Sequence, residues 1–190
     1  MRKSPDVPLA SADFPAQIAI LPIDNQAGDA DGALILRALV KRKLEQDRGI
    51  RIQRFEDTDQ IIRDRTSFGP DVPVQVALAK QDPKVLTAWL GVDGILHGKL
   101  LAFNRAQLTI YTRSQVKASF WLTDRENHTL WEGGEDADSG SFGGGSVPIT
   151  SYLTNSGIPP EVLDKISRSP LANATLALVD DAFATFPRRP

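Results

Sequence analysis

Residues 92–131 constrain the fold more than any other part of this chain, because they predict three consecutive β-strands with little chain between them. We place these strands at residues 92–103, 108–123 and 129–131. The middle strand alternates apolar and polar residues along its length, which is the period-two pattern of a strand with one buried face. The polar segment from Asp124 to His128 is typical of a turn between antiparallel strands. A long antiparallel hairpin is therefore predicted as the centre of a sheet.

The polar face of this hairpin carries aromatic and basic residues. A five-residue turn would set Leu122 opposite Leu130 and Trp121 opposite Trp131, although one bulge residue would break that register. Trp, Tyr and Arg are the side chains that most often anchor protein interfaces. The alternative is that a helix of the same chain covers this face. We predict an interface made by Tyr111, Arg113, Lys117, Trp121 and Trp131.

The chain before the hairpin is typical of βα units that feed the same sheet. Residues 17–23 form an apolar strand suited to a sheet that is covered on both sides. Residues 31–45 follow as a helix with an apolar stripe, and Arg37 falls on its polar side. Residues 49–55 predict a short strand. A helix capped by Thr58 then extends to about residue 65.

Two later segments carry clear helix signals. Asp82 followed by Pro83 is a start signal, and Gly91 is well placed to end the same helix in a left-handed conformation. Near the C-terminus, apolar residues recur at helical spacing from Leu171 to Phe183, which predicts a closing helix. Both helices are expected to pack on the sheet.

The predicted fold class is α/β, with a mixed sheet built from βα units and a long antiparallel hairpin, and helices packed on it. Residues 1–16 are rich in Pro, Ser and Asp and predict a flexible leader. Residues 17–186 form a single α/β domain in this interpretation. Within it, residues 133–146 are dominated by Gly, Ser and Asp, a composition that predicts a mobile loop.

Composition excludes several classes of function. The net charge is −2 and the basic residues are scattered, so no positive surface for nucleic acid is expected. The absence of cysteine excludes disulfides, cysteine-based zinc sites and cysteine nucleophiles. No stretch approaches the roughly 20 apolar residues that a membrane-spanning helix requires.

No residue cluster indicates an enzyme, a metal site or a cofactor site. His97 and His128 have no serine in a Gly-x-Ser-x-Gly arrangement to activate. The acidic residues between 132 and 138 lack the spacing of a calcium-binding loop. The glycine-rich run 139–146 lacks the Lys-Ser/Thr pair of a phosphate-binding loop. We therefore predict no catalytic residue, no metal and no cofactor.

Three stretches in a consistent order carry a resemblance to a known family. They are IAILPIDN at residues 18–25, LGVDGILHG at residues 90–98, and LTD at 122–124 followed by TLWEG at 129–133. Together they resemble proteobacterial lipoproteins of unknown function that include a candidate surface vaccine antigen. More distantly, the chain resembles the curli-assembly lipoprotein CsgG and the amino-terminal domain of TolB. The resemblance covers residues 18–184.

The resemblance implies a periplasmic α/β domain that an N-terminal lipid tethers to a bacterial membrane. Such a domain would be non-enzymatic and would contact other envelope proteins, and copies of itself, in envelope assembly or transport. The family provides no catalytic residues to carry over. Because this chain contains no cysteine that could carry the lipid, the interpretation expects a lipidated cysteine ahead of residue 1.

Two other functions stay open at this point. A small-molecule or substrate-binding accessory of a transporter would show a deep, mostly apolar pocket with a few polar groups. A hydrolase using His97 would place a serine or a carboxylate beside that ring. The protein-binding interpretation instead predicts an exposed aromatic patch.

Overall fold

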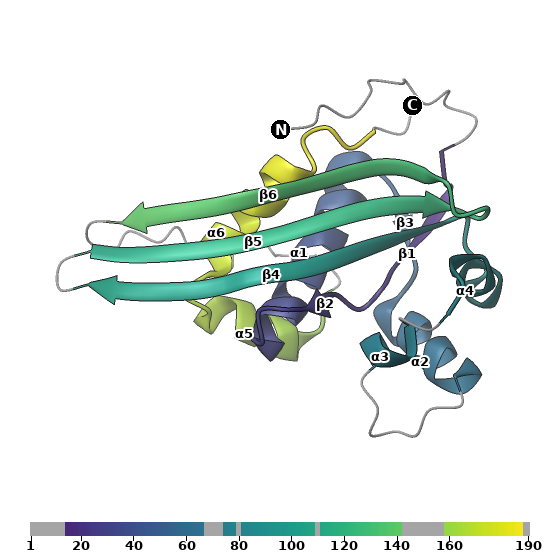
Figure 1. Ribbon diagram of the computed structural model, residues 1–190, viewed down its shortest axis with the longest axis horizontal. Helices are drawn as coiled ribbons and strands as arrows, with labels where there is room; N and C mark the ends of the chain where they lie inside the picture. The colour runs from purple at the N-terminus through teal and green to yellow at the C-terminus, as the bar shows by residue number, and fades with distance from the viewer. Residues whose placement is uncertain (1–13, 67–73, 79–80, 109–110, 142–157, 188–190) are drawn as a thin grey trace.

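The computed structural model describes residues 14–66, 74–78, 81–108, 111–141 and 158–187, and its centre is a six-stranded sheet (Figure 1). The strand order is β3-β1-β4-β5-β6, and β2 pairs with β4 beside this path. The strands are β1 (Gln17–Ile20), β2 (Asp24–Asn25), β3 (Arg51–Ile52), β4 (Gly94–Leu108), β5 (Tyr111–Asp124) and β6 (Thr129–Ser141). The pairs formed by β1, β2 and β3 are parallel, whereas β4, β5 and β6 are antiparallel. The predicted mixed α/β sheet is confirmed.

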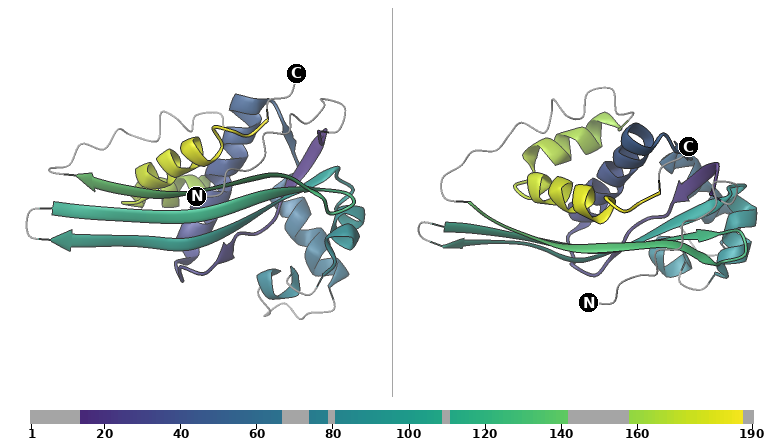
Figure 2. Two further views of the ribbon diagram at one scale, coloured as in Figure 1. Left: turned by 45° about the horizontal axis from the view of Figure 1, so that its top comes forward. Right: turned by 90° about the horizontal axis from the view of Figure 1, so that it is seen from above.

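Helices cover the sheet unevenly. They are α1 (Ala30–Arg48), α2 (Phe55–Arg65), α3 (Val74–Leu78), α4 (Pro83–Leu90), α5 (Pro160–Arg168) and α6 (Ala172–Ala182). One face of the sheet is covered by α1, α5 and α6, while α2, α3 and α4 gather at the end where β5 turns into β6 (Figure 2). Within the described residues, no helix covers the opposite face along most of β4, β5 and β6.

The helix boundaries follow local signals in the sequence. Asp82 accepts a hydrogen bond from the Lys84 backbone N–H, and Gly91 ends α4 with a φ of 64°, as predicted. The prediction that Thr58 caps α2 is wrong, because the helix already begins at Phe55. Thr58 is instead buried inside the first turns, where its hydroxyl donates to the backbone oxygen of Arg54. A hydroxyl that returns to the preceding turn is satisfied without acting as a cap.

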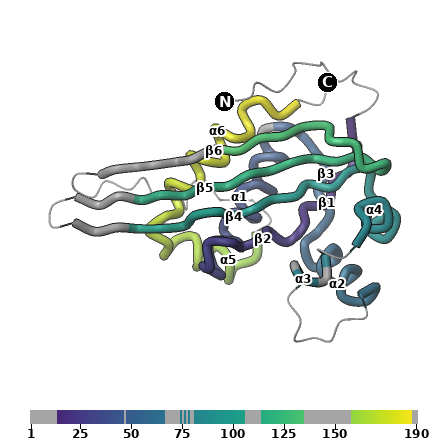
Figure 3. Tube along the Cα trace, in the orientation of Figure 1, coloured from purple at the N-terminus to yellow at the C-terminus, as the bar shows by residue number. Residues whose placement is uncertain are grey.

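Two apolar clusters lie on the two faces of the sheet. The larger lies between the sheet and α1, α5 and α6, and includes Leu96, Phe120 and Leu122. The smaller lies on the other face, where Ala19 and Ile95 pack with residues of α2 and α4. β1 is therefore buried on both sides, as its apolar run predicted. In the Cα trace, the chain leaves β1 and passes through β2 along the edge of β4 (Figure 3).

The prediction of a mobile loop at residues 133–146 is wrong for its first part. β6 continues to Ser141, so residues 133–141 form a strand paired with β5. Residues of low β-propensity can form a strand beside a long partner, because the partner satisfies their backbone hydrogen bonds on one side. The rest of that segment, residues 142–146, and residues 1–13 of the predicted leader lie outside the described residues. Phe14, within the predicted leader, already contacts Phe186 with ring centroids 5.7 Å apart.

One glycine of β6 is required by close packing rather than by flexibility. A Cβ atom at Gly133 would lie 2.3 Å from the Trp131 ring and 2.8 Å from the backbone oxygen of Ala182 in α6. Residues 131 and 133 share one face of the strand because strand side chains alternate. Glycine therefore leaves the space that the Trp131 ring occupies between β6 and α6.

Gly133→Ala is expected to lower the free energy of unfolding by about 2 kcal/mol, because a methyl group would displace a packed ring or a helix backbone. The matched control is Gly134→Ala, where the nearest atom to the new Cβ would be the Ala118 backbone oxygen at 3.2 Å. Urea denaturation of both variants measures the difference. Equal losses at the two positions would contradict this explanation.

Candidate functional site

The candidate site is the face of β4, β5 and β6 that no helix covers within the described residues, which we call the uncovered face (Figure 2). Phe120 and Leu122 point into the main core, so the alternate residues Lys117 and Trp121 lie on the opposite face of β5. Trp121 is half-buried and stacks on its cross-strand partner His97, with ring centroids 4.9 Å apart and planes inclined by 2°. The Nζ atom of Lys99 lies 5.5 Å from the centroid of the Trp121 ring. This face thus combines aromatic and basic groups.

Lysine side chains lie near the Trp121 ring on this face. A lysine ammonium near the face of a tryptophan ring is attracted by the ring quadrupole. Lys117 is exposed two alternations along β5 from Trp121, and Glu132 is exposed opposite Trp121 on β6. We call His97, Lys99, Lys117, Trp121 and Glu132 the Trp121 face. An arrangement of this kind can bind a partner surface that brings apolar and acidic groups, because Trp and Lys side chains contact both.

His97 is a neutral structural residue of this face. Its Nε2 atom lies 3.3 Å from the Thr123 hydroxyl, and burial lowers its pKa to about 4. Among the described residues, no carboxylate is hydrogen-bonded to the His97 ring. The hydrolase alternative expected a serine or a carboxylate beside this ring, whereas the polar group that the structure places beside it is the Thr123 hydroxyl.

The depressed pKa of His97 predicts a loss of stability in mild acid. The unfolded ring binds a proton near pH 6.5, but the folded ring does so only near pH 4. The neutral His97 ring therefore makes its full contribution to the free energy of unfolding above pH 6.5. That contribution is lost as the pH falls from 6.5 towards 4. Because part of the ring is accessible to water, we expect a loss of about 2 kcal/mol.

The measurement compares wild-type protein with His97→Phe, which retains an aromatic ring against Trp121 but cannot titrate. Urea denaturation across the acidic range should show a smaller pH dependence for His97→Phe than for wild type. The same pH dependence in wild type and His97→Phe would contradict the assignment.

The structure removes Trp131 from the predicted interface. The register opposes Trp131 to Leu122, with a shift between Leu122 and Thr123, so the predicted pairing of Trp121 with Trp131 is wrong. Trp131 is 8% exposed and packs against Phe183 and Phe186, with ring centroids 4.9 and 4.7 Å away. The bulge adds one residue to β6 between Thr129 and Trp131. This shift of one residue moves the Trp131 side chain to the face of the sheet that the helices cover.

The structure describes the side chains of only some of the other predicted interface residues. Lys117 and Trp121 lie on the uncovered face. Tyr111 and Arg113 occupy β5 in register with Leu108 and Ala106, but their side chains lie outside the described residues. That they contribute to an interface stays a prediction.

Sequence reasoning missed His97 and Lys99 as members of this face. Their contacts with Trp121 depend on the register between β4 and β5, which pairs His97 with Trp121. The prediction placed the connecting loop between residues 103 and 108, whereas β4 continues to Leu108. The alternation of Ile95, His97 and Lys99 could have assigned them a shared face, but not their partner across the sheet.

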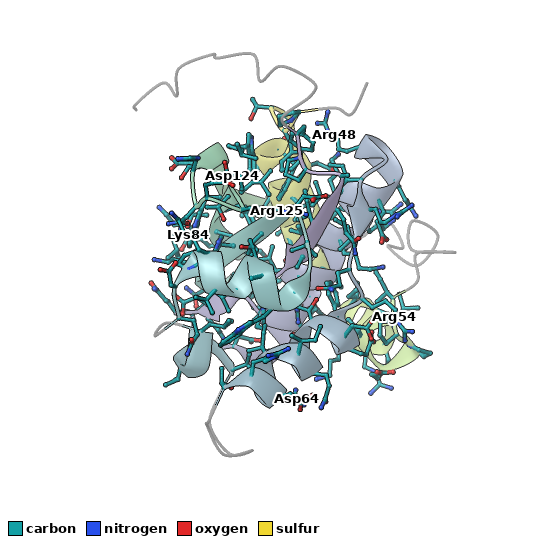
Figure 4. The ribbon with its side chains drawn as sticks, turned by 90° about the vertical axis from the view of Figure 1, so that its right-hand side faces the viewer. Arg48, Arg54, Asp64, Lys84, Asp124 and Arg125 are labelled. Atoms are coloured by element: carbon teal, nitrogen blue, oxygen red, sulfur yellow. The ribbon has the colours of Figure 1, made fainter. Side chains whose placement is uncertain are left out.

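The turn between β5 and β6 gathers three groups that could hold a metal ion: Asp124, Glu126 and His128. Their arrangement is explained by the turn itself, because Asp124 Oδ1 accepts hydrogen bonds from the backbone N–H groups of Glu126 and His128. Burial alone would raise the pKa of Asp124, but the hydrogen bonds and charge of His128 and the Glu126 N–H lower it overall. Figure 4 shows Asp124 and Arg125 beside the helix that carries Lys84.

Comparison with known proteins places the fold. No family model and no curated protein matches the chain. Lipoprotein GNA1162 from Neisseria meningitidis has a similar structure, with a TM-score of 0.60, 18% identity, and coverage of 82% of this chain and 100% of that one. Hypothetical protein CT253 from Chlamydia trachomatis has a TM-score of 0.52 and 13% identity, with coverage of 89% of this chain and 94% of that one. The PelC dodecamer from Paraburkholderia phytofirmans has a TM-score of 0.50 and 12% identity, with coverage of 92% of this chain and 89% of that one.

These similarities show a shared fold, and one of the proteins that share it is a lipoprotein. The predicted resemblance to lipoproteins of unknown function is therefore confirmed at the level of fold, while the more distant resemblance to CsgG and TolB stays a prediction. None of the three proteins is described as an enzyme. Within the part of the chain that the structure describes, no helix has both the length and the apolar character to cross a bilayer.

Proposed function

We propose that this chain is a non-enzymatic domain of a bacterial envelope lipoprotein, and that it acts through protein contacts in envelope assembly or transport. The observation that carries the proposal is the Trp121 face. It presents a half-buried tryptophan and two lysines on a side of the sheet that no described helix covers. A partly exposed aromatic ring beside basic groups on a rigid sheet is suited to binding another protein.

The envelope location rests on the fold. Lipoprotein GNA1162 shares its architecture over the whole length of that chain. We propose a periplasmic domain that an N-terminal lipid attaches to a bacterial membrane, with other envelope proteins as its partners. A lipid anchor would hold the domain near the membrane surface without a membrane-spanning helix.

The location is tested by expressing the full native gene in its own host and determining the mass of the mature N-terminus. A diacylated or triacylated cysteine ahead of this chain, in the membrane fraction, is the expected result. An unmodified N-terminus in the cytosolic fraction would refute the lipoprotein assignment.

The binding face is tested by site-specific photocrosslinking in the same host. A photoreactive residue at position 117 or 132 should give discrete protein adducts, whereas one at Glu161, exposed on α5, should not. Trp121→Ala should reduce the adducts at position 117 several-fold while the protein stays folded, because the aromatic anchor is gone. Unchanged adducts in a folded Trp121→Ala protein would refute the role of this face.

A further inference from the structure

One edge of the sheet is long and open. Among the described residues β6 pairs with β5 alone, whereas the strand at the opposite edge, β3, has only two residues (Figure 1). Gly134 of β6 is exposed, and because glycine has no side chain, the exposed atoms are those of its backbone. A row of accessible, unpaired N–H and C=O groups is a template for a further strand. The edge of β6 near Gly134 is therefore able to pair.

The hydrogen-bond pattern shows which groups of β6 point outward. The backbone oxygen of Leu96 in β4 accepts a hydrogen bond from the chain that follows β1. N–H and C=O groups alternate in direction along a strand, so those of His97 face β5. His97 pairs with Trp121, whose groups therefore face β4, and those of Glu132, directly opposite Trp121, point away from β5. The backbone groups of Gly134, two residues later, point the same way.

The side chains along this edge restrict what can pair with it. Glu132 lies on the uncovered face, is exposed, and forms no ion pair within the described part of the chain. Like charges directly opposite each other destabilise a sheet, whereas opposite charges stabilise it, so Glu132 favours a basic residue on an added strand. Gly134 leaves an empty position on the same face, which an aromatic ring on a neighbouring strand can cover. The edge thus selects for two side chains.

Another protein matches this edge better than a second copy of the chain does. The sequence of β6 contains no lysine or arginine, so a second β6 would bring no basic residue to Glu132. β3 is too short to cover both Glu132 and Gly134. The part of β4 level with these residues is already paired with β1 and β2. The missing strand is therefore expected from a different chain.

We infer that the edge of β6 binds an extended segment of another protein by strand addition. The segment runs antiparallel to β6, the more stable orientation, and places an aromatic residue opposite Gly134 and, two residues later, a basic residue opposite Glu132. Main-chain hydrogen bonds provide the affinity, and the two side chains provide the selectivity. The inference rests on the proposed function, which supplies the partner protein, and it adds the chemistry that this partner would present beside the Trp121 face.

Three labelled peptides test the selectivity with the purified 190-residue chain, using fluorescence anisotropy. Thr-Thr-Tyr-Thr-Lys-Thr-Thr should bind saturably. Thr-Thr-Lys-Thr-Tyr-Thr-Thr, with the order reversed, and Thr-Thr-Tyr-Thr-Glu-Thr-Thr, with the charge reversed, should each bind several-fold more weakly. The variant Glu132→Lys should invert the charge preference and bind the Glu peptide more tightly than the Lys peptide, because the edge then carries a positive charge.

Two further measurements test strand addition itself. The first peptide should slow amide hydrogen exchange at Glu132 and Gly134, whereas the Gly133 N–H, which faces β5, should be protected with or without peptide. Gly134→Pro removes an outward donor without removing a bond to β5, so it should weaken binding several-fold. Gly134→Ala keeps the N–H and should bind more tightly than Gly134→Pro. If Gly134→Pro loses its β-sheet circular dichroism, the Glu132→Lys preference and the exchange pattern decide.

Three outcomes would overturn the inference: no saturable binding of the first peptide, a Glu132→Lys protein with the wild-type preference, or exchange that slows elsewhere but not at Glu132 and Gly134. A wild-type oligomer that Gly134→Pro dissociates would overturn it too, because a second copy would then occupy the edge. The proposed function fails separately. Peptide binding without protein adducts at position 117 would count against the Trp121 face alone, and adducts without peptide binding would count against the β6 edge alone.

Discussion

Trp131→Ala is expected to lower the free energy of unfolding by about 3–5 kcal/mol, the usual cost of removing a buried aromatic ring. The ring is almost completely buried between β6 and α6, in contact with Phe183 and Phe186. Its Nε1–H also donates to the Thr185 hydroxyl at 3.3 Å. Truncation would therefore open a cavity where α6 meets the sheet. Urea denaturation at neutral pH measures the loss.

The matched control is Trp121→Ala, which removes the same side chain from the uncovered face. Because Trp121 is half-buried and contacts His97 and Lys99 on the uncovered face, we expect a loss of about 1 kcal/mol or less. The two variants together separate stability from binding: the first should unfold easily, and the second should fold but bind poorly. A larger loss for Trp121→Ala than for Trp131→Ala would contradict the strand register.

Features that depend on neighbouring residues in the chain were predictable from the sequence. Asp82, Pro83 and Gly91 set the limits of α4 through contacts within one helical turn, and the structure confirms all three. The apolar run of β1 indicated a strand buried on both sides, as observed. These predictions succeeded because the determining interactions are local or because burial on both faces leaves a simple pattern.

Features set by long-range pairing were not predictable in the same way. Residues 104–107 (NRAQ) are mostly polar and suggested a loop, but they lie in β4 beyond the helical layer, where neither face needs to be apolar. The glycines and acidic residues of β6 likewise suggested a loop, although β5 pairs with them through Ser141. The bulge at Leu122 and Thr123 left no sequence signal, yet it decides which face Trp131 occupies.

Arg37 is a further case in which the sequence pattern of a helix misplaces a residue. The apolar stripe of α1 puts Arg37 on the polar side, but its side chain is 6% exposed in the structure. Its guanidinium donates to both carboxylate oxygens of Asp59 at 2.8 Å and to the backbone oxygen of Ile20. It also lies 4.2 Å from the centre of the Phe55 ring. The group thus joins α1, α2 and the end of β1.

Asp59→Ala is expected to lower the free energy of unfolding by about 3 kcal/mol, because it leaves the buried charge of Arg37 without its partner. Asp59→Asn keeps one oxygen acceptor and should cost less. Asp64→Ala is the control on the same helix, since Asp64 is exposed and accepts a hydrogen bond from the exposed Gln60 side chain, and it should change stability by about 0.5 kcal/mol or less. Because the Arg37–Asp59 pair is largely buried, the loss should persist in high salt, where a surface pair would be screened. Urea denaturation at low and high ionic strength measures both effects, and an Asp59→Ala variant as stable as Asp64→Ala would show that the pair does not hold α2 to α1.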